Sequence, residues 1–157
     1  MSEYREKLDG DLLKNLEIVD AALAQLKASP LLENQDFDLK IVHDGYIRAT
    51  LKPSSARIGL VVEVYSLGIQ IHIDRIDEAR WWEGEYLNKP QEIQRDIQIL
   101  LGNSLYVTHK IGFAKIEAKN SSGECLLTMR RFIGFRAALS FLPITRKIIY
   151  LPLYSVV

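Results

Sequence analysis

The chain contains 157 residues with a mass of 17.9 kDa, which corresponds to one domain on the usual scale of about 100–200 residues. Twenty Lys and Arg balance twenty Asp and Glu, and 48% of the residues are hydrophobic, so composition argues against wholesale disorder and against a dedicated nucleic-acid or anionic-membrane binder. A single cysteine, Cys125, excludes an intrachain disulfide and a zinc site built from cysteines.

Residues 4–28 are predicted to form a long amphipathic helix. Their apolar side chains recur at spacings of four and three, which places them on one helical face: Leu8, Leu12, Leu16, Val19, Leu23 and Leu26. The pattern stops at Ser29-Pro30, because proline disfavours helix in the residue before it. We expect this stripe to pack on the domain's own sheet, with a coiled-coil seam as the alternative.

Two β-hairpins are predicted next, because the hydrophobic period changes to two. The first covers residues 39–51, with Asp44-Gly45 as the turn dipeptide. The second runs from residue 58 to 65 and returns from 69 to 76, through Ser66-Leu67-Gly68. Its returning strand places Gln70, His72 and Asp74 on one face.

The middle of the chain changes character at residues 77–87, which we expect to form a short helix weakened by Gly84. Asn88 is the predicted N-cap of a further helix, with Pro90 in its first turn. The apolar face of this second helix consists of Ile93, Ile97, Leu100 and Leu101, and Gly102-Asn103 end it.

Strand patterns resume over residues 105–119 and 125–133, joined by a turn at 120–123. Residues 132–143 fit either a helix or a strand, and residues 147–151 fit a last strand that Pro152 would place at an edge. We therefore predict a single α+β domain over residues 1–157. It contains an antiparallel sheet of about six to seven strands in hairpins, packed against the long N-terminal helix and at least one further helix.

The sequence also predicts that the chain has no targeting signal. Residues 1–11 are charged and lack the apolar run of a secretory peptide, and residues 132–143 are shorter than the ~20 residues that span a bilayer. We expect a cytoplasmic protein without membrane contact. In a reducing compartment, Cys125 is expected to be a small buried hydrophobe in a strand, sharing a face with Leu127 and Met129.

Two groups of polar residues are candidates for chemistry. His72 and Asp74 would share a strand face, which could pair an imidazole with a carboxylate. Glu117 and Lys119 fit the acid-x-lysine element of metal-dependent nucleases. Each group is equally explained as the solvent-facing side of a strand, and no phosphate-binding loop occurs in the sequence. We therefore assign no catalytic residue, no metal and no cofactor.

Charge is distributed unevenly along the chain. Residues 1–44 contain ten acidic and five basic side chains, whereas residues 103–157 contain two acidic and eight basic ones. Such asymmetry marks an interaction surface, unless the acidic helix lies against the basic strands and the fields cancel. In the basic half, lysines and arginines alternate with phenylalanines, which leaves nucleic-acid binding open as an alternative: Lys110, Phe113, Lys115, Lys119, Arg130, Arg131, Phe132, Phe135 and Arg136.

The strongest candidate for a binding site is the acidic and aromatic stretch at residues 77–86. It contains both tryptophans of the chain and a tyrosine, which are residue types enriched at binding hot spots, flanked by carboxylates that would attract a basic partner. The alternative is that the tryptophans belong to the core. The residues that we predict to bind a partner are Trp81, Trp82, Glu83, Glu85 and Tyr86.

The function predicted from the sequence is that of a non-catalytic protein-binding module whose partner is another protein, one with a basic surface. Its size and layout are similar to those of bacterial immunity proteins, which neutralise toxins, and of secretion chaperones. A small metal-dependent hydrolase or nuclease is the first alternative. Nucleic-acid binding by the basic C-terminal half is the second, although the net charge disfavours nucleic acid as the partner.

Overall fold

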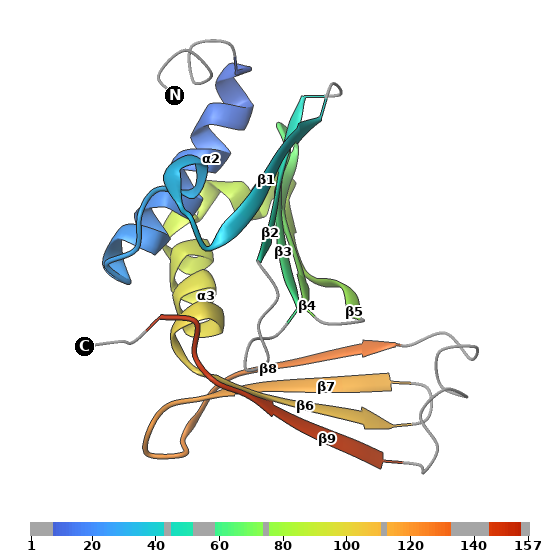
Figure 1. The fold of residues 1–157 in the computed structure, drawn as a ribbon. Coiled ribbons are helices and arrows are strands. Elements are labelled where there is room, and N and C mark those ends of the chain that lie inside the picture. The colour runs from blue at the N-terminus through green and yellow to red at the C-terminus, as the bar shows by residue number, and fades with distance from the viewer. Residues whose placement is uncertain are drawn as a thin grey trace.

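The computed structural model confirms an α+β fold with two antiparallel sheets and a layer of helices (Figure 1). It describes residues 8–42, 45–51, 59–73, 76–110, 113–132 and 145–154. Within these ranges only the backbone is described for residues 42, 76–81, 109, 110, 113, 131, 132, 145, 146 and 150. Residues 133–143 of the ambiguous segment 132–143 and residues 4–7 of the predicted helix lie outside the described residues.

Sheet A contains five strands that lie in chain order, each antiparallel to the next. They are β1 (Phe37–Val42), β2 (Tyr46–Leu51), β3 (Leu60–Val64), β4 (Gly68–Ile73) and β5 (Ile76–Glu83). The strand pairing of both predicted hairpins is therefore confirmed, but the returning strand of the second ends at Ile73, and Ile76 instead begins β5. In the second one, the N–H of Tyr65 donates to the carbonyl oxygen of Gly68 over 2.8 Å and closes the turn.

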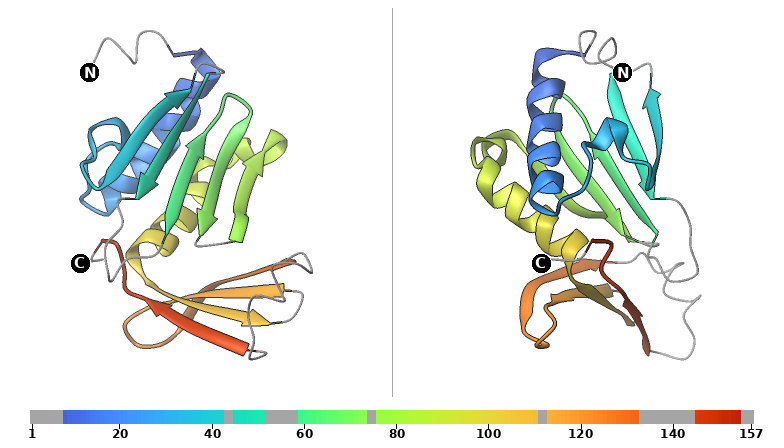
Figure 2. Two further views of the ribbon diagram at one scale, coloured as in Figure 1. Left: turned by 45° about the vertical axis from the view of Figure 1, so that its right-hand side comes forward. Right: turned by 60° about the vertical axis from the view of Figure 1, so that its left-hand side comes forward.

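The N-terminal helix α2 (Gly10–Gln25) lies across one face of sheet A (Figure 2). Its predicted apolar stripe faces the core, because Leu12, Leu16, Val19, Leu23 and Leu26 are at most 6% exposed. The stripe is thus a packing face within the domain, as expected. Asn15, also buried, fixes the helix to the sheet by donating from Nδ2 to the carbonyl oxygens of Tyr65 (2.8 Å) and Ser66 (3.1 Å).

The end of α2 follows from its last residues. The N–H of Ala28 donates to the carbonyl oxygen of Leu23 over 3.0 Å, while Lys27 adopts a left-handed φ of 56°. This is the hydrogen-bonded turn that commonly satisfies the last carbonyls of a helix. Helix α2 thus ends at Gln25, three residues before the predicted end at residue 28, and Pro30 then precedes the short 3-10 helix η1 (Leu31–Glu33).

The second helix, α3 (Pro90–Gly102), packs beside α2 and reaches sheet B at strand β8. The four residues of its predicted apolar face are at most 2% exposed, namely Ile93, Ile97, Leu100 and Leu101. Lys89 occupies the N-cap position instead of Asn88, because Asn88 is the last residue of a 3-10 helix, η2 (Gly84–Asn88). Pro90 is the first helical residue, where its fixed φ and missing N–H cost nothing.

The short helix expected over residues 77–87 is wrong. Residues 76–83 form strand β5, which pairs with β4 so that Trp82 lies opposite Ile69. Glu78, Ala79 and Arg80 are good helix formers, but hydrogen bonding to a neighbouring strand outweighs that preference. Gly84, with a φ of 57°, then turns the chain into η2.

Sheet B contains four strands in the order β8-β7-β6-β9 and crosses the end of sheet A and α3 (Figure 1). They are β6 (Ser104–Lys110), β7 (Phe113–Lys119), β8 (Cys125–Phe132) and β9 (Thr145–Tyr150). The run predicted over residues 105–119 forms two antiparallel strands, β6 and β7. The strands of the protein divide between two sheets, whereas a single sheet was expected. The last strand is an edge, as Pro152 indicated.

One continuous core joins the helices to both sheets. Several side chains on the face of sheet B that points toward this core are at most 7% exposed: Leu105, Val107, Ala114, Ile116, Ala118 and Met129. The opposite face of sheet B carries the polar side chains, which the alternation along each strand separates from the apolar ones. In the part of the chain that the structure describes, no helix is long and apolar enough to cross a membrane.

Candidate functional site

The five residues predicted to bind a partner lie where β5 meets η2, and the structure separates them. Trp82 is only 4% exposed and belongs to the core. Its ring is therefore unavailable as a surface anchor, which corrects the prediction for this residue. Trp81 precedes it, with its backbone opposite Gln70 on β4, and its side chain lies outside the described part of the structure.

Gly68, the first residue of β4, allows β4 and β5 to approach closely. A Cβ atom added to Gly68 would collide with the backbone carbonyl oxygen of Trp82. Because that oxygen belongs to the backbone, it cannot move aside as a flexible side chain could. Gly68 thus sets the position of Trp82 and of the residues that follow it.

Glu83, Glu85 and Tyr86 are exposed, and we call these three residues the acidic-aromatic turn. Tyr86 is 63% exposed. The N–H of Lys89 donates to the carbonyl oxygen of Tyr86 over 3.0 Å, which closes η2 just before α3 begins. The turn is therefore held between a strand on one side and a helix on the other, with its side chains at the surface.

A second group of polar residues, which the sequence analysis missed, surrounds Glu63 on the opposite face of sheet A from the helices. We call Arg48, Glu63, Tyr65 and His72 the Glu63 cluster. The hydroxyl of Tyr65 donates to Oε2 of Glu63 over 2.7 Å, and Nε2 of His72 lies 2.9 Å from the same oxygen. Nη1 of Arg48 lies 3.2 Å from Oε1, and the Glu63 side chain is 6% exposed.

The surroundings of Glu63 decide its ionisation. Burial alone would raise the pKa of the carboxyl group, but hydrogen bonds from Tyr65 and His72 and the charges of His72 and Arg48 hold the pKa below its ordinary 4.5. Burial and the bond to Glu63 raise the pKa of the Tyr65 hydroxyl. The cluster therefore keeps one carboxylate ionised and its donors in place, with Tyr65 stacked on Tyr46 at 4.7 Å between ring centroids.

The structure gives His72 a partner that the sequence analysis did not consider. The pairing with Asp74, two residues further along, stays a prediction, because Asp74 lies outside the described residues. The partner found is Glu63 on the neighbouring strand, because the register places Glu63 opposite Gln70 and diagonal to His72. The signal was present in the alternation, which puts Glu63 and His72 on the same face of one hairpin. Of the other histidines, His43 and the side chain of His109 are not described.

Glu117 and Lys119, the residues of the predicted acid-x-lysine element, have different partners. Oε1 of Glu117 lies 2.9 Å from Nζ of Lys115, and this hydrogen bond is the main reason why the Glu117 pKa is lowered. The ammonium of Lys119 lies 4.8 Å from the centre of the Tyr106 ring. Among the residues described, no three His, Cys, Asp or Glu side chains are grouped as metal ligands would be.

The polar face of sheet B carries a group of cations. Lys115 lies opposite Arg130 on β8 and opposite Thr108 on β6, and Thr108 in turn lies opposite Lys147 on β9. The positive charges of Lys115, Lys119 and Lys147 all contribute to lowering the pKa of Glu117. We call Lys115, Lys119, Arg130 and Lys147, with Tyr106 among them, the basic face of sheet B.

The expectation that Cys125 is buried is wrong, because the thiol is exposed. The pairing of β7 with β8 is irregular at this point: Ala118 lies opposite Leu127, but Lys119 lies opposite Cys125, which leaves Leu126 as an extra residue. This β-bulge reverses the alternation and moves Cys125 away from the face of Leu127 and Met129. Its Sγ lies 3.2 Å from Oγ1 of Thr128, on the polar face.

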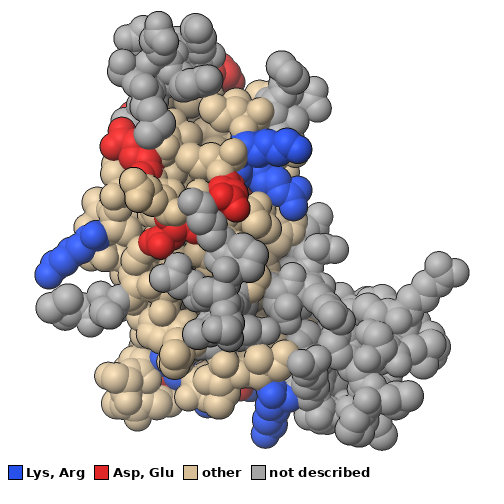
Figure 3. All heavy atoms as spheres, viewed as in Figure 1, with Lys and Arg blue, Asp and Glu red and all other residues tan. Residues whose placement is uncertain are grey.

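The acidic and basic residues are separated in the structure as well as along the sequence. Helix α2 packs mainly on α3, η1, β3 and β4, so it does not lie against the basic strands. Within the described residues, residues 8–51 contain seven acidic and four basic side chains, whereas residues 104–154 contain two acidic and seven basic ones. On the face drawn in Figure 3, most of the acidic side chains lie over the upper part, with α2 and sheet A. The two ends of the molecule thus differ in sign.

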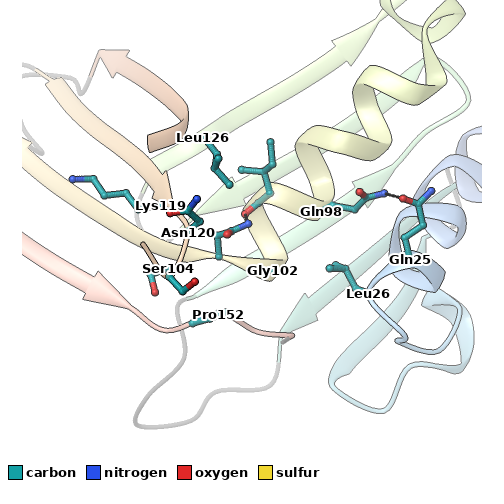
Figure 4. Close-up of a pocket in the computed structure, with 12 residues that line it drawn as sticks. Gln25, Leu26, Gln98, Gly102, Ser104, Lys119, Asn120, Leu126 and Pro152 are labelled. Carbon is teal, nitrogen blue, oxygen red and sulfur yellow. Dashed lines mark hydrogen bonds between the residues drawn. The ribbon is translucent and has the colours of Figure 1, made fainter. Parts of the chain in front are cut away.

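An open hollow lies between the C-terminal ends of α2 and α3, the β7–β8 turn and Pro152, with a volume of about 790 Å³ (Figure 4). Nε2 of Gln98 donates to Oε1 of Gln25 over 2.7 Å along one side of it. Most of the polar groups that line the hollow are uncharged amides and hydroxyls, and Lys119 lies at its far side. None of the five residues predicted to bind a partner lines this hollow, because η2 is at the other end of α3.

Comparison of the chain with protein-family models, with curated proteins and with solved structures found no match. Its function is therefore argued from its own residues.

Proposed function

We propose that this chain is a non-catalytic protein-binding module, and that the acidic-aromatic turn binds a partner with a basic surface. The observation that carries this proposal is the exposure of Tyr86, at 63%, beside two exposed carboxylates on one short turn. Tyrosine offers a rigid apolar ring and a hydroxyl group, which makes it one of the commonest anchors at protein interfaces.

The setting of the turn supports this role. Trp82 is buried directly before it, and α3 begins soon after it, so the turn is held at both ends. A site that is already ordered loses less conformational entropy on binding than a flexible loop does. Glu83 and Glu85 would attract a basic partner over several ångströms and increase the rate of encounter.

Within this class, we propose that the chain is a bacterial, cytoplasmic protein that either neutralises a toxin, as immunity proteins do, or escorts a secreted protein before export. These two forms differ in the state of the partner. An immunity protein binds a folded toxin and suppresses its activity, whereas a secretion chaperone binds an unfolded segment of its cargo. Hydrogen exchange of the partner, free and bound, distinguishes them.

A site-specific crosslink tests the proposal directly. A photoreactive phenylalanine analogue replaces Tyr86 in the native host, and the matched control replaces Leu67, which is 77% exposed on the β3–β4 turn. We expect a protein adduct from position 86 and none of the same mass from position 67. The purified partner should then bind the Tyr86→Ala variant about thirtyfold more weakly. Equal adducts from both positions, or unchanged affinity, would contradict the proposal.

A second candidate function, nucleic-acid binding, is favoured by the basic face of sheet B. The charges of Lys115, Lys119 and Lys147 all act on one carboxylate, Glu117, which is already paired with Lys115. Labelled single-stranded DNA tests this candidate, because binding should weaken steeply with salt and should be lost in a Lys119→Glu, Lys147→Glu variant. Binding that is insensitive to these changes, or no binding at low salt, would exclude this face.

A further inference from the structure

Strand β1 forms an open edge of sheet A. Among the strands that the structure describes, it is the first in the sheet order and pairs with β2. Four consecutive residues of β1 are exposed, residues 38–41, and two of them are large and apolar, Leu39 at 38% and Ile41 at 44%. An exposed edge with apolar side chains can pair with another strand through its outward-facing backbone N–H and C=O groups.

We propose that two copies of this chain associate through β1, edge to edge and antiparallel, with Leu39 on the two-fold axis. In this register Leu39 faces Leu39 of the second copy, and Ile41 faces Phe37. Asp38 faces Lys40, and by symmetry Lys40 faces Asp38. Residues that lie directly opposite each other share a face of the sheet, so the apolar pairs continue the apolar face and the charged pairs continue the polar one.

Charge complementarity selects this register. If Lys40 were on the axis, two lysines would face each other, and if Asp38 were on the axis, two aspartates would do so. Like charges directly opposite each other destabilise a pair of strands, whereas opposite charges stabilise it. With Leu39 on the axis, both charged pairs are attractive and the centre is apolar.

The neighbour of Lys40 within its own sheet favours the same arrangement. Lys40 lies opposite Arg48 on β2, so the side chain directly across from it is a second cation. Arg48 is itself 3.2 Å from Glu63, on its other side. An anion placed beyond the edge, at the position of Asp38 in the second copy, therefore gives Lys40 an anionic neighbour, as Glu63 does for Arg48.

A second copy is the occupant that the sequence of β1 fits. The strand carries one anion and one cation on either side of an apolar centre, so it is complementary to itself when it is reversed. The acidic-aromatic turn follows β5 at the opposite edge of sheet A, and this dimer leaves it open. The inference is thus independent of the proposed function.

Charge reversal with rescue tests the interface, using the full chain and sedimentation over a range of concentrations. We expect a concentration-dependent dimer, and Asp38→Lys or Lys40→Asp alone should weaken it about tenfold, because both symmetry-related pairs become repulsive. The double variant with both changes should restore the dimer. Glu17→Lys, an exposed change on α2, is the control and should leave dimerisation unchanged.

A crosslink tests the register itself. In a Cys125→Ser background, Leu39→Cys places two thiols opposite each other on the axis and should form a disulfide-linked dimer on mild oxidation. Ile41→Cys is the matched control, because Ile41 faces Phe37 in this register and should crosslink far less. A monomer at the highest soluble concentration, a dimer indifferent to the charge reversals, or equal crosslinking at both positions would overturn the proposal.

Discussion

Glu63 and His72 lie on the two strands of one hairpin, with Oε2 of the carboxylate 2.9 Å from Nε2 of the imidazole. The register places Glu63 opposite Gln70, so the contact with His72 is diagonal. Tyr65, the first residue after the strand that carries Glu63, donates its hydroxyl to the same oxygen over 2.7 Å. The turn between β3 and β4 therefore brings together three polar groups that are separated along the chain.

The Glu63 cluster should make stability depend on pH. Its surroundings lower the pKa of Glu63 below 4.5, so the stabilisation is fully present above that pH and is lost as pH falls through the lowered value. Glu63→Gln keeps a hydrogen-bond acceptor but removes the ionisation. The free energy of unfolding, measured with urea from neutral pH to about 3, should fall less steeply in this variant than in the wild type. Parallel curves would show that Glu63 contributes no pH dependence.

Gly68 should be sensitive to the smallest substitution. Gly68→Ala would place a Cβ against the carbonyl oxygen of Trp82, and separating β4 from β5 to relieve the contact should cost about 1–3 kcal/mol. Gly10→Ala is the matched control, because a Cβ there meets nothing within 4 Å at the start of α2. It should leave stability unchanged or raise it slightly, since alanine favours helices. Thermal unfolding of the two variants, side by side, makes the comparison.

Local sequence patterns predicted much of this fold, and the features that they did not predict depend on pairing between strands. Leu16 and Leu23 repeat at helical spacing, so α2 was visible from the sequence alone. Strand β5 was not, because the residues around Ala79 carry helical preferences that only pairing with β4 overrides. The bulge at Leu126 arises from the register of β7 against β8, and no single segment encodes it.

The same distinction applies to the candidate site. Tyr86 was named as a binding residue from its residue type, which reports what a surface could bind, although its segment was expected to be a short helix. The burial of Trp82 depends on which face of β5 packs on the core, and that required the strand to be recognised first. Glu63 was missed because its partners come from another strand, so its role is a property of the hairpin and not of a motif.

The leucine stripe of α2 should be essential for stability. Leu16 and Leu23 are fully buried, so replacing either with alanine should cost about 2–5 kcal/mol, a large part of a domain's total stability. Glu17→Ala, at an exposed position of the same helix, should change stability by less than about 0.5 kcal/mol. Denaturant unfolding measures both. A small loss at Leu16 would show that the helix does not pack on sheet A in solution.

Cys125 should react readily with thiol reagents in the folded protein, because its Sγ is exposed on the polar face of sheet B. The rate of labelling at neutral pH should be close to that measured in denaturant. Leu127→Cys in a Cys125→Ser background gives the comparison, since Leu127 lies opposite Ala118, which is buried, and packs against the core. That thiol should react more slowly. Slow labelling of Cys125 itself would mean that the bulge does not form.

Trp82 and Tyr86 should have opposite effects when each is truncated. Trp82 is 4% exposed and packs in the core, so Trp82→Ala should cost about 3–5 kcal/mol of stability. Tyr86 is 63% exposed, so Tyr86→Ala should barely change the unfolding temperature, and its effect should fall on binding. Reversing Glu83 and Glu85 to lysine should mainly slow association with the partner, and added salt should reduce the difference.

Tryptophan fluorescence tests the burial of Trp82 and needs no binding partner. In a Trp81→Phe background, Trp82 is the only tryptophan, and its emission should be blue-shifted and inaccessible to iodide. Loss of both properties in mild denaturant should coincide with global unfolding, because the ring belongs to the same core as α2 and sheet A. Emission like that of free indole, quenched by iodide in the native protein, would place Trp82 at the surface and return it to the acidic-aromatic turn.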